Sequence, residues 1–163
     1  MASFQARKAI GDAHERRVAQ ELENRRWSVS AWGQGIMGEP IRRALRTTNS
    51  SLRWTPDLIA ARDGRIVLLD CKGSMTSAAS RRHVVERAAV VAHLQLVAWT
   101  QLPLYYVFDN LDLLDPHDAL GRGQVGPASP AGSGTPYLLV PVARSLGFDE
   151  VFGIPQEPAA SAA

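Results

Sequence analysis

An Asp-Gly pair between two short apolar runs is the feature that most constrains how this chain folds. Asp63 and Gly64 tolerate the positive φ angles of a tight primed turn, so together they predict a β-hairpin. The runs on either side, 58–61 and 66–69, have the length and the apolar character of strands. If the arginines that flank the turn face each other, the register of the hairpin follows from the sequence.

This register predicts that Asp57 lies directly opposite Asp70. Facing side chains of an antiparallel pair have Cβ atoms about 5 Å apart, and like charges repel there. A divalent cation offsets the repulsion, because hard cations bind oxygens from two or more carboxylates. Lys72 lies two residues beyond Asp70, so its ammonium group is expected on the same face. The alternative is a turn aspartate after Pro56 and a separate solvated ion pair at the strand end.

The spacing of these residues resembles a known nuclease motif. Pro56-Asp57, twelve further residues and then Asp70-Cys71-Lys72 is similar to the PD-(D/E)xK motif of the restriction-endonuclease-like nucleases. Among these, the chain most resembles the archaeal-type Holliday junction resolvases, over about residues 8–110. There, a helix that carries Glu precedes a strand, a glycine-rich loop and the motif. The resemblance implies an α/β fold with a mixed sheet of four or five strands flanked by helices.

The resemblance also implies a metal-dependent deoxyribonuclease. Asp57, Asp70 and the backbone carbonyl of Cys71 would hold Mg²⁺, for which Mn²⁺ would substitute. Lys72 would orient or deprotonate the attacking water and offset charge on the phosphate. Glu15 would bind the metal directly or through water. The Cys71 side chain, on the opposite strand face, is expected to pack in the core.

The first predicted helix explains why Glu15 is a candidate. The helix is expected over residues 4–24, with Ser3 as its N-cap. Glu15 shares a helix face with Val18 and Leu22, so it points towards the core, where a carboxylate needs a partner. It resembles the first-helix Glu of the nuclease family, and the alternative is an ion pair with an arginine. His14 beside it is expected at the surface or in contact with substrate.

The distribution of charge favours DNA as the partner. Residues 1–87 contain 16 of the 18 basic residues and 9 of the 16 acidic ones, which makes this part the predicted DNA-binding half. A basic loop before the hairpin and the start of a second helix are predicted to contact phosphates. Trp54 could stack on a base or pack beside a strand. The predicted nucleic-acid-binding residues are Arg42, Arg43, Arg46, Arg53, Arg81, Arg82 and His83.

The rest of the chain alternates predicted strands and helices. We expect a strand at 27–32, a flexible glycine loop at 33–38 and a helix from about 77 or 80 to 100. After the helix we expect a strand at 102–108, a last strand at 137–142 and a short helix or turn at 143–152. A helix followed by such a strand indicates a βαβ crossover.

Three local patterns in this part have simple interpretations. Gln95 and Trp99 distantly resemble the Gln-x-x-x-Tyr of RecB-like nucleases, but helix packing is preferred. The aspartates between 109 and 118 lack the alternate-position spacing of a calcium loop and predict a solvated turn. A Gly, Pro and Ser-rich stretch at about 121–136 predicts a mobile loop.

Length and composition limit the classes of protein to which this chain can belong. A chain of 163 residues with 45% hydrophobic content is expected to form one domain over 1–154, followed by a disordered tail at 155–163. No apolar run approaches the eighteen or so residues of a membrane span, and no signal-peptide core is visible, which predicts a cytoplasmic protein without a membrane partner. The single cysteine excludes an internal disulfide and a multi-cysteine zinc site.

The expected function is therefore that of a Mg²⁺-dependent DNA endonuclease. A structure-specific enzyme of recombination, like a Holliday junction resolvase, would act as a homodimer, because paired cuts need two sites related by a two-fold axis. One alternative is a RecB-like nuclease that acts on DNA ends or single strands. Another is a non-catalytic DNA-binding or assembly protein with a nuclease fold, against which the joint presence of Glu15, Asp57, Asp70 and Lys72 argues.

Overall fold

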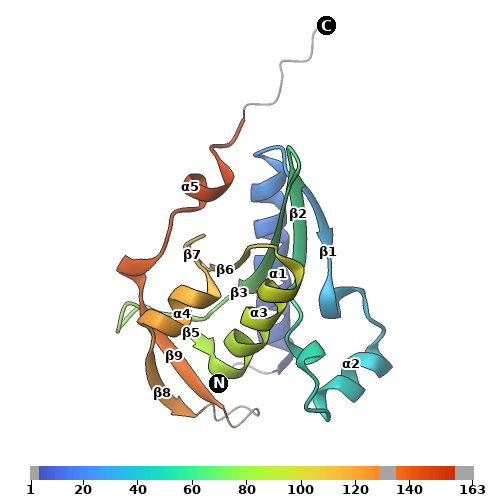
Figure 1. Cartoon of the computed structure of the whole chain (residues 1–163), viewed down its shortest axis with the longest axis vertical. Coiled ribbons are helices and arrows are strands. Elements are labelled where there is room, and N and C mark those ends of the chain that lie inside the picture. Colours follow the sequence, from blue (N-terminus) through green and yellow to red (C-terminus); the bar gives the residue numbers. More distant parts are fainter. Residues whose placement is uncertain (1–3, 129–134, 157–163) are drawn as a thin grey trace, which may run out of the picture.

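The computed structural model describes residues 4–128 and 135–156. Within them the chain forms two sheets (Figure 1). The larger sheet has the strand order β1-β2-β3-β6-β7, with β1 (Ser28–Ala31), β2 (Leu58–Arg62), β3 (Arg65–Lys72), β6 (Leu104–Phe108) and β7 (Leu113–Leu114). The smaller sheet has the order β4-β5-β9-β8, with β4 (Thr76–Ser77), β5 (Arg82–Glu86), β9 (Pro136–Pro141) and β8 (Gln124–Ala128).

Helices flank the larger sheet. The α-helices are α1 (Phe4–Glu23), α2 (Glu39–Arg46), α3 (Arg87–Thr100), α4 (Pro116–Arg122) and α5 (Phe148–Phe152), and the 3-10 helices are η1 (Gly33–Ile36), η2 (Ser51–Trp54) and η3 (Val142–Arg144). β3 is antiparallel to β2 and parallel to β6. The predicted mixed α/β architecture, including the crossover through α3, is therefore confirmed.

The hairpin forms as the sequence predicts. Asp63 and Gly64 have φ angles of 50° and 76°, the positive values that a primed turn needs. Arg62 faces Arg65 across the turn, and strict pairing continues to the far end of β2. This local element builds the centre of the sheet, because β3 also pairs with β6.

Alternation along β3 assigns its side chains to two different cores. Val67 and Leu69 pack with Val18 of α1, whereas Leu68 packs with Val90 of α3. α1 and α3 accordingly cover opposite faces of the sheet (Figure 1). The same alternation directs the later even-numbered residues of β3 towards the α3 face.

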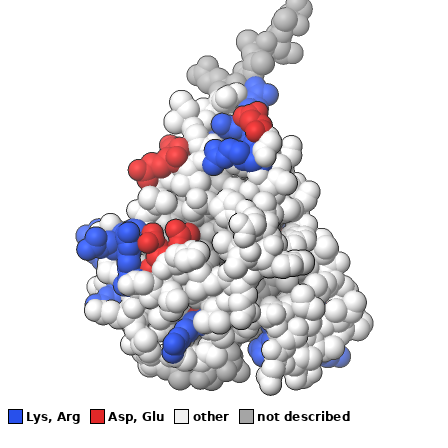
Figure 2. Space-filling model, viewed as in Figure 1, with Lys and Arg blue, Asp and Glu red and all other residues white. Residues whose placement is uncertain are grey.

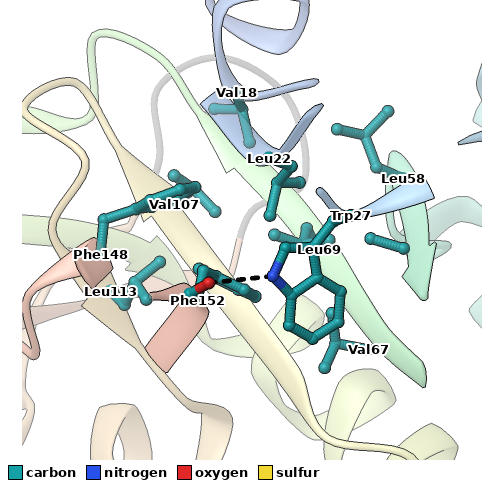
Figure 3. Close-up of a cluster of buried hydrophobic side chains, with 11 residues drawn as sticks. Val18, Leu22, Trp27, Leu58, Val67, Leu69, Val107, Leu113, Phe148 and Phe152 are labelled. Carbon is teal, nitrogen blue, oxygen red and sulfur yellow. Dashed lines mark hydrogen bonds between the residues drawn. The ribbon is translucent and has the colours of Figure 1, made fainter. Parts of the chain in front are cut away.

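The core beneath α1 joins distant parts of the chain. Figure 3 shows Trp27 beside Phe152, with the indole Nε1 donating a 3.0 Å hydrogen bond to the Phe152 carbonyl. The two rings meet edge to face, 5.3 Å between centroids. Leu22 of α1 is fully buried in this cluster, and burial of one such side chain stabilises the fold by about 1.5–3 kcal/mol. α1 is thereby held at a fixed position against β3.

The helix predicted from about residue 77 or 80 begins later, at Arg87. The residues before it form β4 and β5, and β5 buries His83 and Val85 at alternate positions. Two adjacent valines, Val84 and Val85, fit a helical or a strand period, and antiparallel pairing with β9 decides for the strand. The sequence pattern did not predict this second sheet.

Two segments expected to be irregular contain regular structure. The acidic stretch forms β7 and the start of α4, where Asp115 caps the helix by accepting a 2.8 Å hydrogen bond from the Asp118 N–H. The loop expected at about 121–136 contains β8, and residues 129–134 lie outside the described part.

The two ends of the chain are only partly described. Ser3, the predicted N-cap, and residues 157–163 of the predicted tail lie outside the described residues. Gln156, which belongs to that tail, donates a 2.9 Å backbone hydrogen bond to the Asn24 carbonyl. Among the described helices, none has the length and apolar content needed to cross a membrane.

Candidate active site

Asp57 directly precedes β2, and backbone hydrogen bonds fix its position. Its N–H donates to the Leu69 carbonyl at 2.9 Å, and its carbonyl accepts from the Trp32 N–H at 2.7 Å. The last regular pair of the hairpin is Leu58 opposite Leu69, so regular pairing stops one residue short of Asp57. The predicted register therefore holds up to Leu58, and the ladder becomes irregular at Asp57.

The Asp57 carboxylate nevertheless reaches the end of β3. Its Oδ2 accepts a 2.7 Å hydrogen bond from the Cys71 N–H. Gly33 permits the chain to pass closely here, because its φ of 59° suits glycine and an added Cβ would collide with the Pro56 carbonyl. The predicted flexible glycine loop is thus partly a 3-10 helix, η1, that packs against the residue before Asp57.

Asp70 and Lys72 form a buried ion pair on the α3 face of β3. Lys72 Nζ lies 2.6 Å from Asp70 Oδ2, and Asp70 is only 6% exposed. Apart from this contact with the ammonium, Asp70 Oδ2 has no hydrogen-bond partner among the described residues. The Lys72 charge offsets part of the cost of burying the carboxylate.

The three charges perturb one another. Burial and the neighbouring Asp70 raise the pKa of Asp57 well above its ordinary value. Burial also acts to raise the pKa of Asp70, but the Lys72 ammonium and, after it, His93 outweigh burial, and the pKa of Asp70 is lowered. Burial acts to lower the pKa of Lys72, and the two aspartates reverse this, so its pKa is raised. The pKa values of the two carboxyl groups are thus moved apart, and Asp57 is the one that holds a proton more readily.

The donor set fits a magnesium ion. In the described part of the chain, no group of three or more His, Cys, Asp or Glu side chains is arranged to hold a metal. Mg²⁺ commonly takes only one or two carboxylates, with waters and substrate phosphate as its other ligands. In an extended strand, the N–H and the C=O of one residue point to the same edge. The Cys71 N–H points to Asp57, so the Cys71 carbonyl faces that edge too. Two carboxylates and one carbonyl suit that ion.

Glu15 lies near this site but lines the next cavity. The cavity of about 380 Å³ beside α1 and α2 is lined by Glu15 and Asp12, whereas Asp57 and Asp70 line a separate cavity of about 260 Å³. Gln34 lines both cavities. Burial first, then Asp12 and more weakly Asp70, raise the pKa of Glu15. Its carboxylate is therefore within electrostatic range of Asp70, although it opens onto a different cavity.

His93 of α3 is a site neighbour that the sequence pattern did not reveal. Its Nε2 donates to the Trp54 carbonyl, so its Nδ1 accepts from the Tyr106 hydroxyl at 3.0 Å and lies 3.9 Å from Asp70 Oδ2. Burial lowers its pKa, which keeps the ring neutral. The available signal was a lone histidine in an apolar helix.

His14 also has a structural role rather than the expected surface position. Its side chain is buried, and Nε2 bonds to the Val107 carbonyl at 2.9 Å. The Cβ of His14 also lies against Gly73, directly after the motif. His14 therefore holds α1 to the end of the central sheet. Cys71, as predicted, packs in the core on that side, and burial raises the pKa of its thiol.

The basic segment before the hairpin is ordered rather than a loop. Glu39 and Pro40 at the start of α2 favour a helix beginning. Glu39 pairs with Arg42 at 2.9 Å and with Arg46 at 3.1 Å, both on the surface. Arg43 is exposed. These arginines stay available to DNA, because exposed ion pairs contribute about 0–1 kcal/mol.

The remaining predicted DNA contacts fare differently. Arg53 lies over the Trp54 ring at 5.4 Å, and Arg81 is exposed, whereas Arg82 is half-buried in β5. His83 is fully buried, stacked on Phe108 at 3.8 Å between centroids. The expectation that His83 contacts DNA is therefore wrong, because the strand rather than a helix carries it inwards.

The face seen in Figure 2 carries few charged side chains, and they lie in separate small groups. This face therefore does not present a continuous basic surface to DNA. Arg42 and Arg46 line the cavity beside α2 together with Asp12, Glu15 and Glu39, and Arg53 lines the cavity of Asp57 and Asp70.

Comparison with solved structures supports the fold. Neither a protein-family model nor a curated protein matches the sequence. Among solved structures, Hjc, a Holliday junction resolvase from the archaeal hyperthermophile Archaeoglobus fulgidus, is similar with a TM-score of 0.57 and 11% identity, over 90% of this chain and 98% of that one. D212, a nuclease from a fusselovirus, has a TM-score of 0.49 and 11% identity, over 87% and 89% of the two chains. The chain therefore shares the fold of the archaeal resolvase Hjc.

Proposed function

We propose that this chain is a metal-dependent DNA nuclease that hydrolyses phosphodiester bonds. The observation that carries the proposal is the convergence of Asp57, Asp70 and Lys72 at the end of the central hairpin. Two carboxylates share one buried site, and the Lys72 ammonium lies 2.6 Å from one of them. The shared fold with a Holliday junction resolvase supports the choice of DNA as substrate.

The proposed ligands of Mg²⁺, or of Mn²⁺ in its place, are Asp57, Asp70 and the Cys71 carbonyl, with Glu15 acting directly or through water. When bound there, the cation supplies Lewis-acid polarisation of the phosphate and makes a nearby water more acidic.

The chain's own groups position and neutralise the reacting atoms. The Cys71 N–H fixes one oxygen of Asp57, which keeps that carboxylate aimed at the site. The Lys72 ammonium would orient the attacking water and offset the charge that develops on the phosphate. Water adds to phosphorus, one P–O bond of the backbone breaks, and the leaving oxygen takes up a proton. His93 holds the Trp54 carbonyl and thereby steadies the segment that leads into Asp57.

A four-way junction is the first substrate to test, because Hjc is a Holliday junction resolvase. Labelled junction, flap, linear duplex and single-stranded DNA should be incubated with the protein, with and without Mg²⁺. We expect cleavage of at least one substrate with Mg²⁺, and none with Asp70→Asn. Equal cleavage by Asp70→Asn would place the chemistry elsewhere, and absence of cleavage of every substrate would leave a binding protein with a nuclease fold.

Junction resolution further requires a symmetric dimer, because two cuts need two sites. Sedimentation of the protein with a four-way junction measures this directly. A monomer on the junction would leave a simpler nuclease.

A further inference from the structure

Two adjoining cavities follow the outer side of α3, and together we call them the α3 groove. Their volumes are about 420 Å³ and 260 Å³. Ser51, Trp54, Ala92 and Gln95 line both of them. The larger one also includes Asn49 and Arg87, and the smaller one Leu52 and Trp99.

The groove exposes apolar surface that the fold does not cover. Trp99 is 83% exposed and Leu52 is 53% exposed, so the preferred interpretation of helix packing is wrong for Trp99. A tryptophan ring that stays in contact with water contributes little hydrophobic stabilisation to the fold. Large exposed apolar side chains gathered in a groove mark a binding surface.

The polar groups of the groove narrow the chemistry of its ligand. No Asp or Glu lines either cavity among the described residues. Arg87 lines the larger cavity of the groove, and Arg53, which lines the adjoining cavity of Asp57 and Asp70, has its guanidinium 5.4 Å from the centre of the Trp54 ring. Aromatic faces, amide groups and guanidinium groups without carboxylates suit a ligand that combines flat rings, polar ring edges and negative charge. A nucleotide has all three.

The groove continues into the candidate active site. Trp54 and Thr55 line the groove, and they also line the cavity that contains Asp57 and Asp70. His93 bonds to the Trp54 carbonyl, so the backbone between the two cavities is held in a fixed position. A strand whose phosphate lies at the carboxylates can therefore place its neighbouring bases in the groove.

We propose that the α3 groove binds unstacked bases of a single-stranded segment next to the bond that is cleaved. The proposal rests on the nuclease function and specifies its substrate class. Bases in an intact duplex stack on each other and cannot reach Trp54 or Trp99. The groove therefore favours DNA with unpaired nucleotides beside the cleavage point.

The test measures base stacking without cleavage. Single-stranded oligonucleotides that carry 2-aminopurine at successive positions are titrated with protein in EDTA, and a blunt duplex serves as the comparison. Wild-type protein should quench the fluorescence at some positions of the single strand. Trp99→Ala should lose part of that quenching and bind the single strand about 5- to 100-fold more weakly. Trp99→Phe should retain both properties, and duplex affinity should change less than about twofold.

Ile154→Ala is the matched control, because Ile154 is 72% exposed and lies outside the groove. It should behave as wild type.

Unchanged quenching in both Trp99→Ala and Leu52→Ala would overturn the proposal, as would an equal loss on single strand and duplex. A shift of Trp99→Ala from dimer to monomer, with single-strand affinity intact, would instead assign the groove to a contact between two copies. Single-strand stacking without any Mg²⁺-dependent cleavage would contradict the nuclease function and leave the groove assignment standing.

Discussion

The N–H of Cys71 and the carboxylate of Asp57 are joined by a 2.7 Å hydrogen bond across the open end of the hairpin. This bond occurs where regular pairing of β2 and β3 has ended, so a side chain replaces a backbone partner. One Asp57 oxygen is thereby fixed, and the carboxyl group is held against Asp70. The same end of β3 carries Lys72, so three of the four proposed side chains of the site lie at the open end of the hairpin.

Asp57→Ala, Asp70→Ala and Lys72→Ala are each expected to abolish cleavage while DNA binding stays nearly intact. These groups act as a unit, so double variants should lose little more than single ones. Lys72→Arg should not restore activity, because a planar guanidinium replaces a compact ammonium that fits beside Asp70. Single-turnover rates at saturating DNA measure the effect. Wild-type rates in any of the three alanine variants would remove that residue from the site.

Metal dependence should follow coordination chemistry. Mg²⁺ and Mn²⁺ are expected to support cleavage, whereas Ca²⁺ should permit binding with little turnover, because its coordination is larger and looser. Cleavage assays with each ion after dialysis against EDTA test this. Full activity in EDTA would contradict the proposed ligands.

Asp57→Asn is expected to stabilise the protein in the absence of divalent cations at neutral pH. Burial and Asp70 raise the pKa of Asp57, so above the ordinary value of 3.8 the folded state keeps a proton that the unfolded chain releases. The contribution of this group to stability is therefore greatest in acid and falls as pH rises through the folded-state pKa. Asparagine keeps an acceptor for the Cys71 N–H and removes the charge.

Thermal unfolding in EDTA measures this effect. A gain of about 1 kcal/mol would raise Tm by about 2–4 °C for a chain of this length. The gain should shrink as pH approaches the ordinary pKa of 3.8. An Asp57→Asn variant less stable than wild type at every pH would show that the carboxylate is not under electrostatic strain.

The α2 arginines are expected to contribute affinity rather than catalysis. Removing one side chain that binds a phosphate should flatten the slope of log K against log salt by about 0.9 on duplex DNA. Arg42→Ala together with Arg43→Ala should therefore reduce the slope by roughly two for all sequences alike. Rates at saturating DNA should fall far less than for Asp70→Ala.

Glu39→Gln is the matched charge test for the same surface. Its carboxylate occupies Arg42 and Arg46, and these arginines lower the pKa of Glu39, so it is ionised. Its removal should strengthen DNA binding by up to about fivefold at low salt, since exposed pairs contribute about 1 kcal/mol or less. Weaker binding by Glu39→Gln would mean that α2 order, rather than free positive charge, limits the interaction with DNA.

His83 should make the fold sensitive to acid. Burial lowers its pKa below the ordinary value of 6.5, although Asp112 and Asp109 oppose the shift. Below 6.5 the unfolded chain therefore binds a proton that the folded chain does not, and stability falls as pH decreases through this window. His83→Gln should show a weaker dependence of Tm on pH between about 7 and 5, at a lower Tm throughout because the stack on Phe108 is removed.

His117→Gln provides the control for this prediction, because His117 is exposed. It should leave the pH profile unchanged. Identical profiles for wild type and His83→Gln would assign the acid sensitivity to other groups. DNA affinity at neutral pH should be the same in both variants, since neither side chain is proposed to contact DNA.

The sequence by itself determined the hairpin and most of the proposed site. The turn at Asp63-Gly64, the two strand runs and the period of two are local properties, and they pair β2 with β3 and put Asp70 and Lys72 on one face. Asp57 lies just beyond the regular pairing, where the Trp32 N–H also holds it. The helical period likewise placed Val18 and Leu22 in the core. Local geometry was enough for these predictions, because the residues concerned are close in the chain and few backbone dihedral angles lie between them.

Only the tertiary structure decided the features that depend on distant partners. β5 is a strand because β9 pairs with it, and this pairing buries His83 instead of exposing it to DNA. His93 became a neighbour of Asp70 because α3 packs against the Trp54 segment. Glu15 lines a separate cavity because the packing of α1 fixes its height along β3. Apolar pattern predicts that a face is buried, but the partner that buries it is set by long-range packing.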